Sequence, residues 1–335
     1  SRVYQSARYQ IDRLNPAQVD AILAALERAV ELDPACAPAY ADLADVHLAG
    51  AILAVADPRV AVPKARMAAR RALALDPNLP RAHLAQARVA AWVEMDGEAA
   101  GRAIRSAMLL APHASDDLIM AVSTAGLVDV DLDIVDLLER VSRLDPQSPR
   151  IKVALGALLQ DVAPERALTL WSEAIAAEPG FWMALFERSH WLVRHGEVGQ
   201  AIADLEGALA GSQRNSLVLA FTVRALVQHG DRAGAQRLLD ELVERSAHAH
   251  VPGTVLAVAH SALGDHDRGL AEIARARAEG DLRMAFYERS ASLAPLRHQA
   301  SLRLGRVGDH AVGNGVEGGE GGVTPRAGTG PVPDE

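Results

Sequence analysis

The sequence has one cysteine, few aromatic residues, no long hydrophobic run and no basic excess. Cys36 alone cannot form an internal disulfide, so the fold does not depend on an oxidising compartment. Aromatic residues make up only 4% of the 335 residues, so Leu, Ala, Val and Ile must build the core. The longest apolar runs, such as Leu217 to Val223, are far shorter than a membrane-spanning helix. The net charge of −9 does not indicate nucleic-acid binding by this segment.

Sequence motifs for catalysis are also lacking. The chain has no Walker A motif, no G-x-S-x-G and no H-E-x-x-H. Gly313, Gly315 and Gly318 satisfy G-x-G-x-x-G, but a dinucleotide site needs a strand before them and a helix after them. Neither is indicated, so we interpret these glycines as part of a flexible tail. We expect no catalytic residue and no cofactor.

Two groups of polar residues could suggest a metal site. Asp129, Asp131 and Asp133 resemble the start of a calcium loop, but Ile134 and Arg140 stand where the loop needs Gly and Glu. We interpret the three acids as favourable charges at a helix N-terminus. Four histidines lie close in sequence without a neighbouring cysteine, and we interpret them as solvated rather than as zinc ligands. They are His248, His250, His260 and His266.

What the sequence does contain is a regular series of proline and glycine marks. Five tripeptides end in proline at spacings of 43, 35, 34 and 33 residues, and three glycines then recur at intervals of 34. Because proline ends a helix, a period of about 34 residues predicts a solenoid of helix pairs. The marks are Pro34, Pro77, Pro112, Pro146, Pro179, Gly196, Gly230 and Gly264.

The repeats resemble the tetratricopeptide (TPR) family, which places a Leu-Gly pair in the first helix and alanines in the second. The fifth repeat is clearest, with Leu155, Gly156 and Trp171, and the fourth is least typical, with Leu118. Where helices cross closely, only small residues leave room for the neighbouring backbone. The matching small residues are Ala44, Ala65, Ala72, Ala100, Ala107, Ala167, Ala174, Ala201, Ala208, Ala235 and Ala276.

The resemblance implies an all-α, TPR-type helix-turn-helix solenoid, a right-handed superhelix of antiparallel helix pairs. We expect about eight repeats and C-terminal capping helices over residues 1–307, and a disordered Gly/Pro-rich tail over residues 308–335. Three departures stand out. Ala51 to Pro63 carries about nine extra residues, Gln213 replaces a closing proline, and Gly269 stands where alanine is usual.

The opening stretch YQSARYQ (Tyr4 to Gln10) and the closing stretch HSALGDHDRGLAEIARARAEG (His260 to Gly280) are similar to one TPR subfamily. There the array forms the C-terminal half of bacterial winged-helix transcription regulators and adenylate/guanylate cyclases. The resemblance implies a non-catalytic protein-interaction and regulatory module, with a transcription regulator favoured. Alternatives are the regulatory region of a cyclase or serine/threonine kinase, and a free-standing adaptor or oligomerisation scaffold. A cytoplasmic location is expected, or a periplasmic one if a membrane span precedes Ser1.

In TPR arrays the first helix of each repeat lines a concave groove, and the resemblance transfers those positions to this chain. Five of them are arginines, which pair well with carboxylates, so we expect a protein or peptide partner with an acidic segment. The alternative is that these arginines pair with acids of adjacent helices. A homo-oligomer is compatible with the sequence. The predicted groove residues are Asp45, Arg81, Arg88, Trp92, Ser123, Arg150, Gln160, Phe186, His190, Arg194, Arg224 and Gln228.

One predicted helix gathers a large share of the chain's aromatic residues. Phe181, Trp182, Phe186 and Trp191 lie within eleven positions of one another. We interpret them as core residues, and a hydrophobic anchor for a partner is the alternative.

Overall fold

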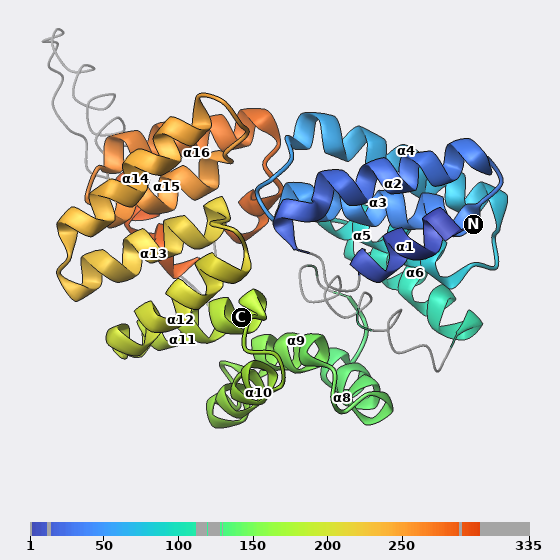
Figure 1. The fold of residues 1–335 in the computed structure, drawn as a ribbon, viewed down its shortest axis with the longest axis horizontal. Helices are drawn as coiled ribbons and strands as arrows, with labels where there is room; N and C mark the ends of the chain where they lie inside the picture. Colours follow the sequence, from blue (N-terminus) through green and yellow to red (C-terminus); the bar gives the residue numbers. More distant parts are fainter. Residues whose placement is uncertain are drawn as a thin grey trace, which may run out of the picture.

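The computed structural model describes residues 2–11, 15–111, 119, 128, 130–287 and 290–301, and these form helices and connecting turns with no β-strand. Figure 1 shows the helices as a curved array of antiparallel pairs, in agreement with the predicted all-α solenoid. The helices of the first half are α1 (Arg2–Ile11), α2 (Val19–Leu32), α3 (Ala37–Ile52), α4 (Pro58–Leu75), α5 (Pro80–Val89) and α6 (Gly97–Leu110). Those of the second half are α8 (Ile134–Leu144), α9 (Pro149–Leu159), α10 (Pro164–Ala177), α11 (Trp182–Arg194), α12 (Val198–Gly211), α13 (Ser216–His229), α14 (Arg232–Ser246), α15 (Gly253–Ala262) and α16 (His266–Glu279).

In the described part of the chain four short helices accompany them, and residues 294–301 continue as a further α-helical segment after the last of the four. A turn of π-helix, η2, extends α5, and two 3-10 helices follow α16. Their bounds are η1 (Pro16–Gln18), η2 (Ala90–Glu94), η3 (Leu282–Phe286) and η4 (Ala291–Leu293). None of the helices in the described part of the chain is long and apolar enough to cross a membrane.

In the described part of the chain, helices end before the proline marks as the sequence predicted, and Pro112 lies outside that part. Helix α2 ends at Leu32, two residues before Pro34, and α4 ends at Leu75, two residues before Pro77. The later glycines end helices differently, because each adopts a left-handed backbone conformation that only glycine enters freely. The φ angles of Gly196, Gly230 and Gly264 are 86°, 96° and 86°.

The sixth repeat, where Gln213 replaces proline, turns by another route. Gln213 and Arg214 both have positive φ angles, of 53° and 57°, so two non-glycine residues make the left-handed turn. The side chain of Arg214 is held by Glu241, with Nε donating to Oε1 at 3.1 Å. The turn is followed at once by Asn215, which caps α13.

The small residues of the repeat pattern are the most deeply buried positions of the fold. The two helices of each pair contact each other along their lengths, and most of the pattern alanines that face these contacts have no solvent exposure. A side chain added at Gly156 would meet Trp171 Nε1 at 2.5 Å. At Gly269 the place of a methyl group is already taken, because a Cβ there would lie 2.8 Å from Leu296 Cδ2. That contact explains why glycine replaces alanine in this repeat.

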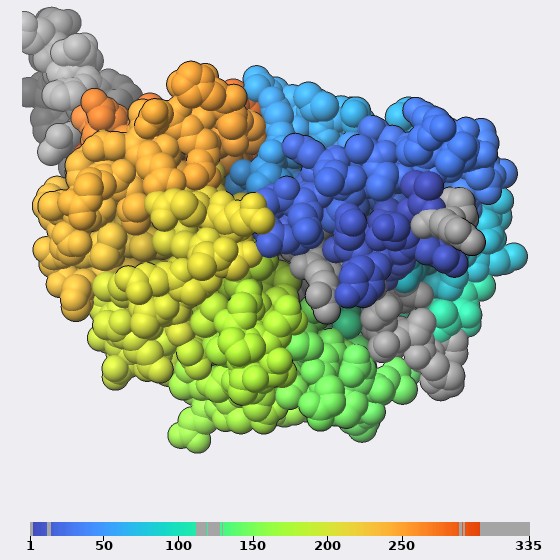
Figure 2. All heavy atoms as spheres, viewed as in Figure 1, coloured from blue at the N-terminus to red at the C-terminus, as the bar shows by residue number. Residues whose placement is uncertain are grey.

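The array closes on itself, which the sequence did not predict. In Figure 1 the chain curves so that α14–α16, at the left, meet α2–α4, at the right, along the top of the view. Figure 2 shows the atoms of these two parts in direct contact there. Ala54 follows α3, yet it is 2% exposed and belongs to the apolar cluster formed by α11–α16. Leu282 of η3 is conversely buried in the cluster of the first three helix pairs.

We call this contact the seam, and its centre is the segment between α3 and α4. Two asparagines extend it to the turn between α12 and α13, through hydrogen bonds to backbone carbonyls far along the chain. Asn15 Nδ2 donates to Gly211 O at 2.9 Å, and Asn215 Nδ2 donates to Leu53 O at 2.7 Å. The extra residues that the sequence showed in the second repeat therefore contribute directly to closing the ring.

Some predictions concern residues outside those that the structure describes. They are the tail at residues 308–335, Leu118 of the fourth repeat, Ser123 of the predicted groove and Asp129 of the rejected calcium loop. Within the described part, Asp133 caps α8, accepting a hydrogen bond from Asp136 N at 2.9 Å. This agrees with the interpretation of the acids as helix-terminal charges.

Candidate functional site

The first helices of the pairs form the inner surface of the ring. Helix α3 contacts α5, α9 contacts α11, and α13 contacts both α11 and α15. These helices carry most of the predicted groove residues and form a wall in two described stretches, one of α3 and α5 and one of α9, α11, α13 and α15. We use "inner surface" for this wall together with η2 and η3, which contact each other where the two ends of the array meet.

On the part of the inner surface that α3 and α5 form, arginines pair with acids. Arg81 Nη1 lies 3.3 Å from Asp42 Oδ1, and Arg88 Nη1 lies 3.3 Å from Asp45 Oδ1. The side chains of Arg88 and Asp45 are 12% and 13% exposed. Burial still raises the pKa of Asp45 to about 6, although Arg88 opposes the shift. In this half of the inner surface, the arginines pair with acids of a neighbouring helix. This is the alternative that the sequence left open.

Aromatic contact joins the two ends of the wall. The ring of Trp92 in η2 meets the ring of Phe286 in η3 edge to face, with centroids 5.6 Å apart. Arg283, three residues before Phe286, donates from Nη1 to Ile52 O at 3.2 Å. Helix η3 is thus held against the first half of the array by an apolar residue, an aromatic contact and a hydrogen bond.

Three arginines of the second half lie around His190, and the acids that act on them are Asp161, Glu187 and Asp281. Arg194 lies on α11, Arg224 on α13 and Arg283 on η3, and all three act on His190. Burial and these three positive charges lower the pKa of His190 to about 3, so the imidazole is neutral at pH 7. We call Arg194, Arg224 and Arg283, with Glu187 and His190, the central basic cluster.

The one carboxylate inside this cluster is weakly ionised. Burial raises the pKa of Glu187 to about 7, although Arg283 and Arg194 oppose the shift. Burial also lowers the pKa of Arg283, and burial together with Arg194 lowers that of Arg224. A partly desolvated group of guanidinium ions with a half-protonated acid is an environment that favours a bound anion.

The polar contacts of the cluster fix where its arginines point. Arg194 donates to Gln160 Oε1 at 2.5 Å and lies 3.5 Å from Asp161, whose side chain is 76% exposed. Arg224 Nη1 donates to Ser292 Oγ at 2.8 Å. Gln228 Nε2 donates to Val193 O at 3.4 Å. Gln160 and Ser292 are neutral and orient the guanidinium groups, whereas Asp161 partly offsets the charge of Arg194.

The aromatic residues of α11 are mainly core residues. Phe181, Trp182 and Phe186 are 6%, 4% and 9% exposed. Phe186 and Phe221 flank His190, with ring centroids 6.5 and 5.0 Å from the imidazole. Their packing fixes the histidine next to the arginines.

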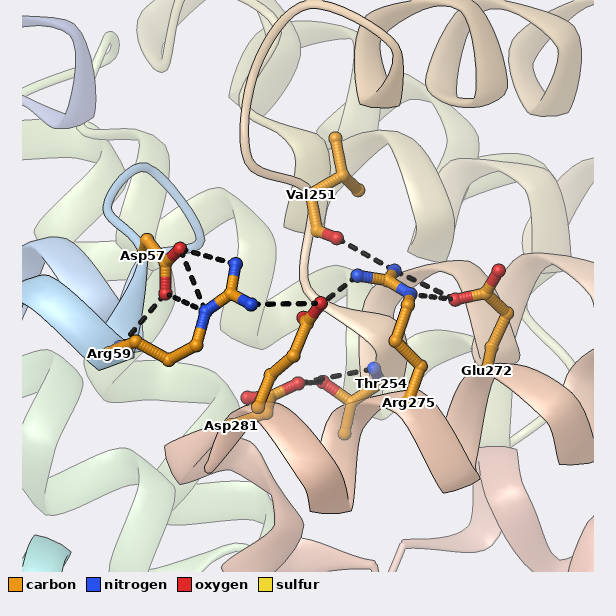
Figure 3. A network of polar contacts seen from close by, with 8 residues as sticks. Asp57, Arg59, Val251, Thr254, Glu272, Arg275 and Asp281 are labelled. Atoms are coloured by element: carbon orange, nitrogen blue, oxygen red, sulfur yellow. Dashed lines mark hydrogen bonds and ion pairs between the residues drawn. The ribbon is translucent and has the colours of Figure 1, made fainter.

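The seam holds a pocket of about 450 Å³ whose wall is a chain of charges (Figure 3). Asp57 accepts from Arg59, Arg59 lies 4.0 Å from Glu279, and Arg275 bridges Glu279 and Glu272 at 2.9 and 2.7 Å. Arg275 also donates to Val251 O at 2.9 Å. Since the acids already have basic partners, this chain of charges ties α4 to α16 across the seam.

The histidines are placed differently from the prediction that all four are solvated. His248 is exposed, but His260 is only 4% exposed because α15 is enclosed by its neighbours. Burial lowers the pKa of His260, and that of the half-buried His250. In the described residues no group of three or more His, Cys, Asp or Glu side chains is arranged to hold a metal ion.

Sequence reasoning missed Glu187, Arg283 and the two seam asparagines. Arg283 lies after the last recognisable repeat, where no groove position could be transferred. The side chain of Asn15 both accepts from Ala17 N as a helix cap and donates across the seam. One feature of the sequence could have indicated the seam. It is the group of extra residues between α3 and α4, which the repeat itself does not need.

Solved structures share this fold at low sequence identity. The Cut9 and Hcn1 hetero-tetramer of APC/C matches with a TM-score of 0.58 and 14% identity, over 88% of this chain and 55% of that chain. The human IFIT1 dimer with m7Gppp-AAAA matches with a TM-score of 0.56 and 14% identity, over 78% of this chain and 68% of that one. No family model and no curated protein matches the sequence.

The repeat pattern, the helix pairs and these neighbours define the class of fold as a TPR-type helical solenoid. At these identities the likeness concerns the fold alone. Within that class, this chain is an array in which the second pair, α3 and α4, meets α16 and η3 at a seam.

Proposed function

We propose that this chain is a non-catalytic scaffold that binds a protein partner through an acidic segment held on the inner surface. The observation that carries the proposal is the central basic cluster, in which Arg194, Arg224 and Arg283 act together on His190. Carboxylates are the natural counter-ions of guanidinium groups, and burial strengthens each such pair. Arg81 and Arg88 contribute less, because Asp42 and Asp45 already neutralise them.

The experiment is a binding titration with fluorescein-labelled hexaglutamate, followed by anisotropy, with a Gly-Ser peptide of equal length as the control ligand. We expect the wild type to bind hexaglutamate and Arg224→Gln to bind it roughly tenfold more weakly, since one charge-assisted contact contributes about 1.5–3 kcal/mol. The matched control is Ser292→Ala, which removes the hydroxyl that Arg224 contacts and keeps the charge. Equal affinity of the wild type and Arg224→Gln would contradict the proposal.

The same experiment also tests a second class of ligand, a nucleic acid. Human IFIT1, which shares the fold, has been solved with PPP-AAAA. The net charge of −9 disfavours a nucleic-acid ligand for this chain. Preferential binding of a 5′-triphosphate AAAA oligonucleotide over hexaglutamate would replace the protein partner in our proposal.

We further propose that the array is the sensor half of a bacterial signalling protein, with a transcription regulator favoured over a cyclase or kinase. This part rests on the resemblance of the opening and closing stretches to that subfamily. Reading the gene upstream of the codon for Ser1 tests it. A winged-helix segment would support it, and a start signal close by would favour a free-standing adaptor.

A further inference from the structure

We infer that closure of the seam positions η3, and that partner binding at the central basic cluster is thereby coupled to ring closure. The inference concerns regulation of the site and rests, for its binding arm, on the proposed function. Arg283 is the residue that joins the two features. It donates to Ile52 O at the end of α3, and its charge acts on Glu187 and His190 of α11.

Helix η3 has apolar contacts with both halves of the array: Met284 packs on the cluster of α11–α16, and Leu282 and Phe286 pack on the first half. It has only five residues, too few to be stable without tertiary contacts. Leu282 is 8% exposed and is buried in the apolar cluster of the first three helix pairs. Phe286 packs on Trp92 at 5.6 Å. If the seam opens, these contacts are lost and Arg283 is no longer fixed beside Arg194 and Arg224.

We expect the contacts across the seam to break together when the ring opens. Two of its hydrogen bonds come from asparagine side chains, and the charged chain through Arg59 and Glu279 is joined by a single 4.0 Å contact. Each asparagine also caps its own helix through Oδ1, which accepts from Ala17 N or Leu217 N. An aspartate at either position keeps the cap, loses the donor that crosses the seam and places one negative charge opposite the carbonyl.

Coupling follows from the reciprocity of linked equilibria. A ligand that pairs with Arg283 binds the closed ring more tightly, because only there is the third arginine in place. The same ligand must then favour closure by the same factor. The anion also relieves the mutual repulsion of Arg194, Arg224 and Arg283, which acts in the same direction.

Hydrogen exchange of the ligand-free full chain, read by mass spectrometry on peptides covering residues 282–287, tests the structural half of the inference. In Asn15→Asp we expect exchange in this segment to be roughly fivefold to tenfold faster than in the wild type, the effect of losing about one hydrogen bond. The control is Asn78→Asp, an exposed residue that receives the same added charge. Asn215→Asp is the second variant, and Asn15→Asp is preferred because Asn215 is only 4% exposed.

Two outcomes would overturn the inference. Either Asn15→Asp exchanges faster at residues 50–57 while residues 282–287 are unchanged, or neither segment responds. The binding arm measures hexaglutamate affinity in the same variants, and we expect Asn15→Asp to bind more weakly by a factor similar to its exchange effect. Failure of the wild type to bind hexaglutamate would refute the proposed function, and the exchange result would still decide whether closure positions η3.

Discussion

At the scale of single residues, the fold depends on glycines as much as on large side chains. Trp171 has no solvent exposure and lies against Gly156 of the preceding helix, where its indole Nε1 donates to Val153 O at 3.4 Å. The space that the indole fills is the space that a β-carbon at Gly156 would need. One glycine therefore sets the distance between α9 and α10.

Replacing Gly156 by alanine should destabilise the protein by roughly 1–3 kcal/mol, because the methyl group would overlap a fully buried indole. Gly199→Ala is the control, since a β-carbon at that helical glycine of α12 meets nothing within 4 Å. It should be neutral or stabilising by up to about 1 kcal/mol. Urea unfolding followed by circular dichroism measures both, and equal stabilities would contradict this account of the helix crossing.

Glu187 is a residue whose ionisation opposes folding. The folded protein holds its proton up to about pH 7, whereas the ordinary pKa is 4.5. The native state therefore binds more protons than the unfolded state between these values, and this residue lowers stability as pH rises from 4.5 to 7.

We expect Glu187→Gln to have nearly the wild-type stability at pH 5 and to be more stable by roughly 1–3 kcal/mol at pH 8, where the wild type must ionise a buried acid. Thermal unfolding at the two pH values measures the difference. A gain of the same size at both pH values would show that ionisation of Glu187 is not its cause.

At the scale of helices, a bidentate ion pair ties α11 to α12. Arg188 donates from Nε and Nη2 to the two carboxylate oxygens of Asp204, both at 2.7 Å, and the side chains are 17% and 7% exposed. Because both charges are largely buried, removing one leaves the other without compensation. Ser172 Oγ, at 3.1 Å from Arg188, is a neutral partner and cannot replace the acid.

Asp204→Ala should cost roughly 3–5 kcal/mol, the usual effect of leaving one member of a buried pair alone. The double variant Arg188→Met with Asp204→Leu should be much closer to the wild type, because neither charge is then buried. Urea unfolding of the three proteins gives the comparison. A double variant as unstable as Asp204→Ala would mean that lost packing, rather than the lone arginine, is responsible.

Helix ends and helix crossings were predictable because their causes are local. Pro34 and Pro77 follow helix ends directly, and the alanines spaced along α4 and α10 face the partner helix. Gln213 shows a limit, because the sequence marks a departure there but not the two left-handed residues that replace proline. The seam was not predictable, since each repeat adds a small rotation and closure depends on their sum.

The candidate site also has a part that could be predicted from the sequence and a part that could not. The positions of Arg194 and Arg224 on one wall follow from the repeat register, which a single sequence displays. The pairing of Arg88 with Asp45 and the arrival of Arg283 beside α11 depend on contacts between elements far apart in sequence. Only the folded structure shows which arginines are least neutralised by nearby acids and are therefore available to pair with a ligand.

At the scale of the whole molecule, the seam changes how the array should unfold. An open solenoid has two free ends, and its outermost repeats lose structure first. Here the second pair and the segment after α16 share apolar residues, with Ala54 buried among α11–α16 and Leu282 among α1–α5. We therefore expect these contacts to protect both parts of the array from unfolding first.

We expect the wild type to unfold in urea in one transition by both circular dichroism and tryptophan fluorescence. The double variant Asn15→Asp with Asn215→Asp should show transitions that no longer coincide, because the ends are released before the middle. Small-angle scattering before the transition should show a larger maximum dimension for the double variant. Coincident transitions and unchanged dimensions would mean that these two hydrogen bonds do not hold the ring closed.

Closure also constrains how such a chain can change over generations. In an open array a helix pair can be duplicated or lost, and the remaining pairs stack as before. In this one, a pair added between α6 and α12 would rotate everything after it and move Asn215 away from the carbonyl of Leu53, which it now reaches at 2.7 Å. Single substitutions within the repeats remain possible. The number of repeats, however, is fixed, because the two parts of the array that form the seam must still meet.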